Sequence, residues 1–265
     1  MKPIQTALFA VALAGCASPE TTGRALVDGA AVTYSRSGQS VPAIVFQSGL
    51  GDDRSTWAGM MQALQGEHMV IAFDRPGYGA SPAGKASRDP CQIAAETRGL
   101  LRELGVKPPY VLVGHSLGGL YQYVYARLYP EDVAGLVLLD PTHPRHWELL
   151  QHHAPATSAA VQVLRATMFG STARAEFDSQ AQCLERIAHD RPLGVSTQLL
   201  VSTRFSALES LDVQAQVLWP LREDWRQLTG AGPLVRVEAG HYIHRDAAVA
   251  RAIRAVASAR GASAL

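Results

Sequence analysis

The chain has 265 residues, of which 47% are hydrophobic and 18% are charged. It can therefore bury one sizeable core, and it lacks the high charge and low hydrophobicity of a disordered protein. Its 24 Lys and Arg nearly balance its 23 Asp and Glu, and no basic run forms a phosphate-binding stripe, which argues against nucleic acid as a partner.

The N-terminus has the pattern of an export signal. Lys2 supplies a basic start, residues 4–14 are largely apolar, and residues 13–16 read Leu-Ala-Gly-Cys. The apolar stretch is shorter than the roughly 20 residues that cross a bilayer, so residues 1–15 are predicted to be a cleaved signal peptide. The ending resembles the lipobox of bacterial lipoproteins, which implies that Cys16 carries a lipid. An ordinary signal peptide is the alternative.

A short tether and one folded domain are expected to follow. Residues 16–24 are mostly small and polar, which is typical of a flexible linker. We expect them to join a lipid anchor, held by a membrane of the bacterial cell envelope, to a domain over residues 25–265.

Within this domain, short apolar runs alternate with stretches of helical spacing. The runs are predicted to be strands, at residues 43–46, 69–73, 110–113, 134–139, 197–202 and 234–237. Helices are predicted between and after them, for example at residues 116–129 and 246–260. This alternation predicts an α/β fold, with a mostly parallel central sheet and helices on both faces. Residues 141–196 have no strand run and are predicted to form an inserted helical lid.

The strongest motif is Gly-x-Ser-x-Gly at residues 114–118, directly after one predicted strand and before a helix. A sharp turn there holds a serine Oγ clear of the sheet, and the unpaired N–H groups of the first helical turn can bind negative charge. The motif predicts Ser116 as a nucleophile and the Leu117 N–H as one donor of an oxyanion hole.

Two further turns carry a family resemblance. Residues 48–51 read Ser-Gly-Leu-Gly after the first predicted strand, and residues 74–81 read Asp-Arg-Pro-Gly-Tyr-Gly-Ala-Ser after the second. Together with the serine motif, they resemble the α/β-hydrolase family over nearly the whole predicted domain. The resemblance implies the α/β-hydrolase fold and a second oxyanion donor, the Leu50 N–H. We interpret Asp74 and Arg75 as structural residues that fix a turn rich in Gly and Pro.

A serine nucleophile needs a base, and histidine is the side chain whose ordinary pKa lies near neutrality. Nine histidines are present. His241 follows the last predicted strand, and the family order of Ser, acid and then His favours it as the base. His244 is the second choice. The remaining histidines suit surface or lid positions, and their spacing predicts no metal site.

The acid of the triad is less sharply defined by the sequence. The usual family site, just after residues 197–202, holds no carboxylate at residues 203–206. Asp140 ends the preceding strand, at the sheet edge where parallel strands deliver functional groups, so we favour it. Asp212 is the rival, and Glu209 is a weaker third choice.

Nucleophile, base, acid and oxyanion donors specify acyl transfer to water through an acyl-serine, without a metal or an organic cofactor. We expect carboxylic-ester hydrolysis, with a small acyl substrate bound under the lid. The same residues could serve a thioester, lactone, amide or carbon–carbon bond. The alternative of another class is a non-catalytic envelope lipoprotein that binds a partner through its lid.

The three cysteines divide into two groups. If Cys16 carries the lipid, then Cys91 and Cys183 remain in an oxidising compartment, where disulfides form. We expect these two to pair and to tie the lid to the core. Two buried free thiols are the alternative.

Overall fold

The computed structural model describes residues 20–187 and 191–259. The predicted signal peptide over residues 1–15, the predicted lipid attachment at Cys16 and the first part of the tether lie outside these residues. Within the described part of the chain, no helix is both long and apolar enough to cross a membrane.

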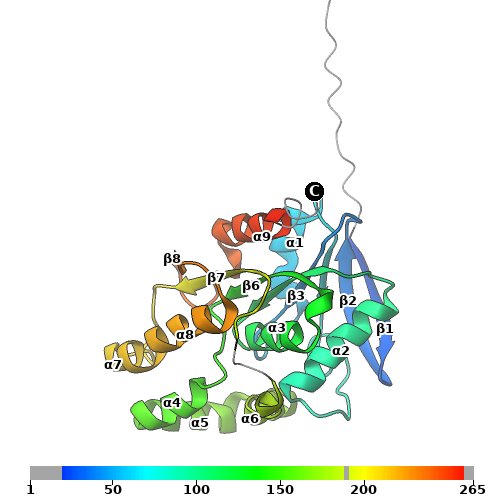
Figure 1. Cartoon of the computed structure of the whole chain (residues 1–265). Helices are drawn as coiled ribbons and strands as arrows, with labels where there is room; N and C mark the ends of the chain where they lie inside the picture. Colours follow the sequence, from blue (N-terminus) through cyan, green and yellow to red (C-terminus); the bar gives the residue numbers. More distant parts are fainter. Residues whose placement is uncertain (1–19, 188–190, 260–265) are drawn as a thin grey trace, which may run out of the picture.

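An eight-stranded sheet forms the centre of the molecule (Figure 1), with the strand order β1-β2-β4-β3-β5-β6-β7-β8. The strands are β1 (Thr21–Val27), β2 (Ala30–Ser37), β3 (Ala43–Gln47), β4 (Val70–Phe73), β5 (Tyr110–His115), β6 (Val133–Leu139), β7 (Ser196–Ser202) and β8 (Val235–Val237). The pairs β1–β2 and β2–β4 are antiparallel, and all other neighbours are parallel. The prediction of a mostly parallel sheet is therefore confirmed.

The sequence pattern does not predict β1 and β2, and it places β1 partly in the tether. The prediction of a tether up to residue 24 is wrong for its last four residues, because β1 begins at Thr21 and pairs with β2 along its whole length. The reason is that this hairpin covers the core on one side only. In β1 only Ala25 and Val27 are buried, so no apolar run marks the strand.

Helices cover both faces of the sheet, as Figure 1 shows. On one face lie α1 (Ala58–Leu64) and α9 (Ala247–Ala259), and on the other lie α2 (Pro90–Glu103), α3 (Leu117–Leu128) and α8 (Trp219–Thr229). Each face of the sheet thus has its own hydrophobic core. Strand β6 lies between the two cores and is buried at every position, which explains its unbroken run of apolar residues.

Between β6 and β7 the described residues form helices and no strand. These are α4 (His146–His153), α5 (Pro155–Met168), α6 (Ser171–Ser179) and the 3-10 turn η3 (Leu184–Arg186). After β7, the short α7 (Leu211–Val213) and a π-helical segment, η4 (Gln214–Leu218), lead into α8. Leu150 of α4 packs against Val213, Val217 and Leu221, so this helical segment lies over the end of the sheet that carries the site described next.

Candidate active site

Ser116 lies in a sharp turn between β5 and α3. Its φ of 53° is positive, a conformation that costs a residue with a side chain about 1–3 kcal/mol and that clusters at active sites. The turn also needs glycine on either side. A Cβ on Gly114 would lie 2.4 Å from the Gly118 carbonyl oxygen, and one on Gly118 would lie 2.3 Å from that of Gln47. The glycines therefore let the turn pack tightly while Ser116 projects from it.

Asp140 and His241 meet beside this turn. Asp140 follows β6, and His241 lies in the loop after β8. The Nδ1 of His241 lies 2.8 Å from Oδ2 of Asp140. Asp212, the rival acid, is exposed on α7, whereas Glu209 lines the same cavity as His241. The structure thus brings together the histidine and the acid that the sequence favours.

Three further donors hold the Asp140 carboxylate. Ser202 donates through its hydroxyl to Oδ2 at 2.8 Å and through its backbone N–H to Oδ1 at 3.4 Å. Arg222 donates through Nη2 to Oδ1 at 2.8 Å. Burial alone raises the pKa of Asp140, but the hydrogen bond and charge of His241 and the charge of Arg222 outweigh it, so the pKa lies well below its ordinary value. The carboxylate is charged throughout the neutral range.

Arg222 is buried and is held over aromatic rings. Its guanidinium lies 4.7 Å from the ring centre of Trp219 and 5.3 Å from that of Phe205. Sequence reasoning misses Ser202 and Arg222, because their roles depend on contacts between β7, α8 and the end of β6. A serine at the end of a strand and an arginine in a helix carry no local signal of this role.

The same contacts set the charge state of His241. Burial lowers the pKa of its imidazole, but the hydrogen bond and the charge of Asp140 raise it by more, so the pKa lies above the ordinary value of 6.5. With Nδ1–H donated to Asp140, the neutral ring keeps Nε2 as a proton acceptor. Ser116, Asp140 and His241 line one cavity.

The other candidate base, His244, occupies a different place. Only 3% of it is exposed, and its ring lies 5.7 Å from that of Trp57 and 5.3 Å from that of His115. Burial lowers the pKa of His244 to about 4 and that of His115 to about 3. Both rings are therefore neutral near pH 7, and His115 supports the site through a contact of 2.9 Å between its Nε2 and the His241 carbonyl oxygen.

The loop expected to supply an oxyanion donor lies against the nucleophile. A Cβ built on Gly49 would lie 3.3 Å from Cβ of Ser116. The Ser48 hydroxyl fixes this loop, because it donates to the Asp53 carbonyl oxygen at 2.9 Å and accepts from the Trp57 indole at 3.0 Å. On the other side of the site, Leu117 is the first residue of α3, so its N–H has no acceptor within the helix. Both predicted donors thus belong to backbone beside Ser116.

A cavity of about 580 Å³ opens at these residues. Its apolar walls come from the lid, from the segment after β7 and from α8, with Leu150, Val161, Phe205, Leu208, Val213, Leu218, Leu221 and Trp225. Polar groups also line it, including His143, His146, Arg204 and Glu209. Of the apolar lid residues, Met168 is 75% exposed and Trp147 packs on Phe177 within the lid. The cavity therefore uses only part of the lid's apolar surface.

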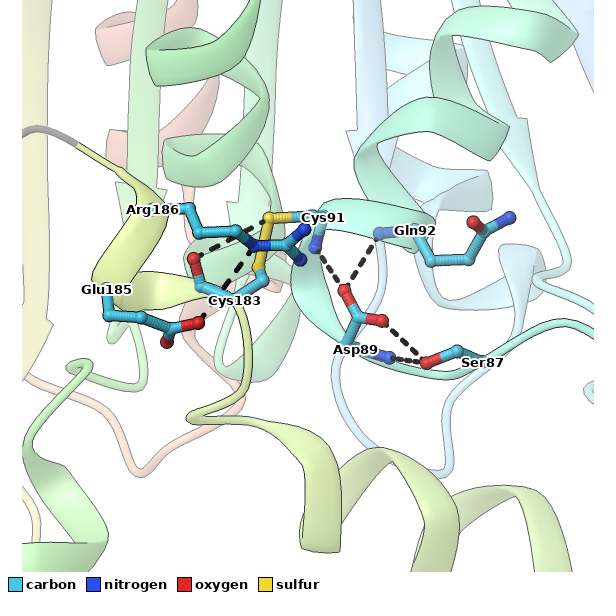
Figure 2. The surroundings of a disulfide bond; sticks show 7 residues. All are labelled: Ser87, Asp89, Cys91, Gln92, Cys183, Glu185 and Arg186. Atoms are coloured by element: carbon cyan, nitrogen blue, oxygen red, sulfur yellow. Dashed lines mark hydrogen bonds and ion pairs between the residues drawn. A yellow bond between two sulfur atoms is a disulfide. The ribbon is translucent and has the colours of Figure 1, made fainter.

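A disulfide joins the lid to the core. Cys91, in the first turn of α2, is bonded to Cys183, which lies just before η3 (Figure 2). Asp89 caps α2 beside the bond by accepting from the backbone N–H groups of Cys91 and Gln92. In the described residues, the one group of side chains with metal-ligand spacing is Asp89 with these two cysteines, and the disulfide engages both sulfurs.

Comparisons with known proteins agree with this architecture. Residues 42–219 match the model of the alpha/beta hydrolase fold family. The chain is 38% identical over 116 residues to the "Uncharacterized protein YqjL" of Bacillus subtilis (strain 168), which covers 43% of this chain and 46% of that protein. It is 31% identical over 140 residues to the "Putative carbamate hydrolase RutD" of Escherichia coli O9:H4 (strain HS), covering 52% and 49% of the two chains. The chain thus spans about half the length of these curated relatives.

Among solved structures, a loop variant of the haloalkane dehalogenase DbeA from Bradyrhizobium elkanii superposes with a TM-score of 0.69 at 19% identity, over 93% of this chain and 99% of that one. At this identity the likeness concerns the fold. Taken with the family match over residues 42–219 and the parallel sheet with its strand-to-helix turn at Ser116, it leads to one conclusion: the chain belongs to the alpha/beta hydrolase fold family.

Proposed function

We propose that the protein is a serine hydrolase that cleaves carboxylic esters through an acyl-serine intermediate. One observation carries the proposal: Ser116, strained into a positive φ, lines the same cavity as a histidine bonded at 2.8 Å to a buried carboxylate. A structural turn does not need this combination. A nucleophile, a base and an acid that orients the base do need it.

The groups act in a definite sequence. Nε2 of His241 takes the proton of Ser116 as Oγ attacks the ester carbonyl carbon, and Asp140 stabilises the imidazolium that forms. The N–H groups of Leu50 and Leu117 bind the negative oxygen of the tetrahedral intermediate. The carbon–oxygen bond then breaks, and His241 passes its proton to the departing alcohol.

Water completes the reaction by the same route. His241 takes a proton from water, the hydroxide attacks the acyl-serine, and the proton returns to Oγ of Ser116 as the carboxylic acid leaves. The apolar walls of the 580 Å³ cavity favour an ester with an apolar acyl or alkyl group of modest size.

The partial likeness to RutD supports a second candidate substrate class. That relative is named as a carbamate hydrolase, and the chemistry proposed for Ser116 also cleaves a carbamate. Parallel assays of p-nitrophenyl esters and p-nitrophenyl carbamates would rank the two classes by kcat/KM.

A fluorophosphonate probe tests the proposal directly, because it reacts only with an activated serine. We expect it to label the protein with one adduct at Ser116 and to abolish ester hydrolysis. Ser116→Ala should take up no label. An unlabelled, folded wild-type protein would instead favour the non-catalytic envelope lipoprotein.

A further inference from the structure

Arg75 joins three parts of the chain that are far apart in sequence. It follows β4, and only 2% of it is exposed. It donates through Nη1 to the Ser48 carbonyl oxygen at 2.6 Å and through Nη2 to that of Gly49 at 2.9 Å. Its Nε and Nη2 also donate to the two carboxylate oxygens of Glu176 on α6, each at 2.9 Å. One side chain therefore links the loop beside Ser116 to the lid.

The bond to Gly49 fixes the direction of a catalytic donor. The Gly49 carbonyl and the Leu50 N–H belong to the same peptide group, which is planar, so in its trans form the two point in opposite directions. With the carbonyl held toward Arg75, the N–H points away from it. Because the donor to this carbonyl is charged, it also polarises the peptide and strengthens the N–H as a donor.

Glu176 in turn fixes Arg75. Its side chain has no exposed surface, and it also accepts from Arg88 Nη2 at 3.1 Å and from the Tyr78 hydroxyl at 3.0 Å. The Tyr78 ring also lies beside Arg75, with the guanidinium 4.7 Å from the ring centre, so Tyr78 belongs to the same buried network. Burial raises the pKa of Glu176, but the charges of Arg75 and Arg88 lower it by more, and the carboxylate remains charged.

The position of this network is not explained by stability alone. Buried ion pairs are costly to desolvate, and apolar residues of similar volume often stabilise a fold as well. Here the arginine at the centre of the network donates to two carbonyl oxygens of one loop, and the carboxylate that holds this arginine comes from the lid. The Cys91–Cys183 bond and the pair of Arg88 with Glu96 fasten the same region to α2.

We propose that Arg75 and Glu176 are positioning residues, through which the lid helix α6 holds the Gly49–Leu50 peptide in the orientation that stabilises the oxyanion. The inference rests on the proposed serine hydrolysis and adds that the lid takes part in the chemistry as well as enclosing the substrate. Neither residue touches the substrate.

The test compares an ester with its thionoester, in which sulfur replaces the carbonyl oxygen. Sulfur accepts weaker hydrogen bonds, so a well-placed donor favours the ester more than the thionoester. In Glu176→Gln and Arg75→Lys we expect kcat for the ester to fall by at least about tenfold, since loss of a whole oxyanion donor costs about 10²–10³. KM should change little, and the ratio of ester to thionoester rates should fall with kcat. Loss of folded enzyme would lower both rates equally.

Two more variants make the result decisive. Tyr78→Phe removes one hydroxyl of the network and provides the test if Glu176→Gln and Arg75→Lys do not fold. In this variant the ratio of ester to thionoester rates should also fall, by a smaller factor. Asp132→Asn is the matched control, because Asp132 is also a buried carboxylate bonded to an arginine, Arg98, and its described side-chain partners, Arg98 and Tyr125, lie outside the loop. It should lower the melting temperature and leave the rate ratio unchanged.

The outcomes separate this inference from the proposed function. A wild-type protein without ester hydrolysis would overturn both. An active wild type whose folded Glu176→Gln, Arg75→Lys and Tyr78→Phe variants keep the wild-type ratio would overturn the inference alone. An equal fall of the ratio in Asp132→Asn would also overturn it, since the effect would then not depend on the loop.

Discussion

Replacing Asp140 with asparagine gives the sharpest test of the triad. In the structure, Oδ1 accepts from Arg222 and the Ser202 N–H, whereas Oδ2 accepts from His241 and the Ser202 hydroxyl. An asparagine NH₂ cannot face a guanidinium or a backbone N–H, because all of these groups are donors. The amide oxygen must therefore take the Oδ1 position, and the NH₂ group must face His241.

This orientation selects the wrong tautomer of the base. Nδ1 of His241 becomes an acceptor, the proton moves to Nε2, and Nε2 can no longer take the proton of Ser116. In serine proteases the same exchange lowers kcat by about 10⁴, which is roughly 5 kcal/mol at 1.36 kcal/mol per decade. For Asp140→Asn we expect a loss of at least about 10² in kcat.

Initial rates with a p-nitrophenyl ester, measured beside melting temperatures, provide the assay. Asp212→Asn is the control, because Asp212 is exposed on α7, and it should retain activity. If Asp140→Asn kept near-native kcat and Asp212→Asn lost it, the reasoning from the tautomer would be refuted. Equal melting temperatures would show that the loss is chemical, since Asp140 also precedes the turn at Pro141.

Two further predictions follow from His241 and from the disulfide. Because only neutral His241 can act as the base and its pKa is raised, kcat/KM should rise with pH through an inflection above 6.5. That inflection should move to lower pH in Asp140→Asn. A wild-type inflection below pH 6.5 would contradict the proposed effect of Asp140 on the pKa of His241. The bond between Cys91 and Cys183 spans 92 residues, so replacing both with serine should lower the free energy of unfolding by about 4.6 kcal/mol in the chain-entropy model. Urea unfolding would measure this, and equal stability of the two proteins would contradict it.

Sequence reasoning succeeds where a local pattern has a local cause. The strands flanked by helices are marked by unbroken apolar runs, because both of their faces are covered. The turn at residues 114–118 is marked by glycines that close packing requires. Asp140 is predicted because it directly follows one of these apolar runs, and His241 because the family resemblance puts the base after the last strand; the structure brings the two within 2.8 Å of each other.

Sequence reasoning fails where a residue's role depends on contacts with residues that are distant in the chain. Strands β1 and β2 cover the core on one side only, so their pattern is mixed. The sequence predicts that Arg75 fixes its own turn, yet its carboxylate partner is Glu176, 101 positions away. Nothing in the sequence around Glu176 or Arg222 distinguishes a buried partner from a solvated charge on a helix, because only the assembled fold decides which it is.

The order of the strands has a consequence for how the chain becomes active. Ser116 and Asp140 follow β5 and β6 in the middle of the sheet, whereas His241, 101 positions after Asp140, depends on β8. Among the residues that the structure describes, this last strand has three residues, lies at the edge of the sheet and pairs with β7 alone. A chain that folds progressively from its N-terminus therefore holds an unactivated serine until its final strand has joined. Conditions that loosen this edge would remove the base again while the central strands that carry Ser116 and Asp140 stay paired.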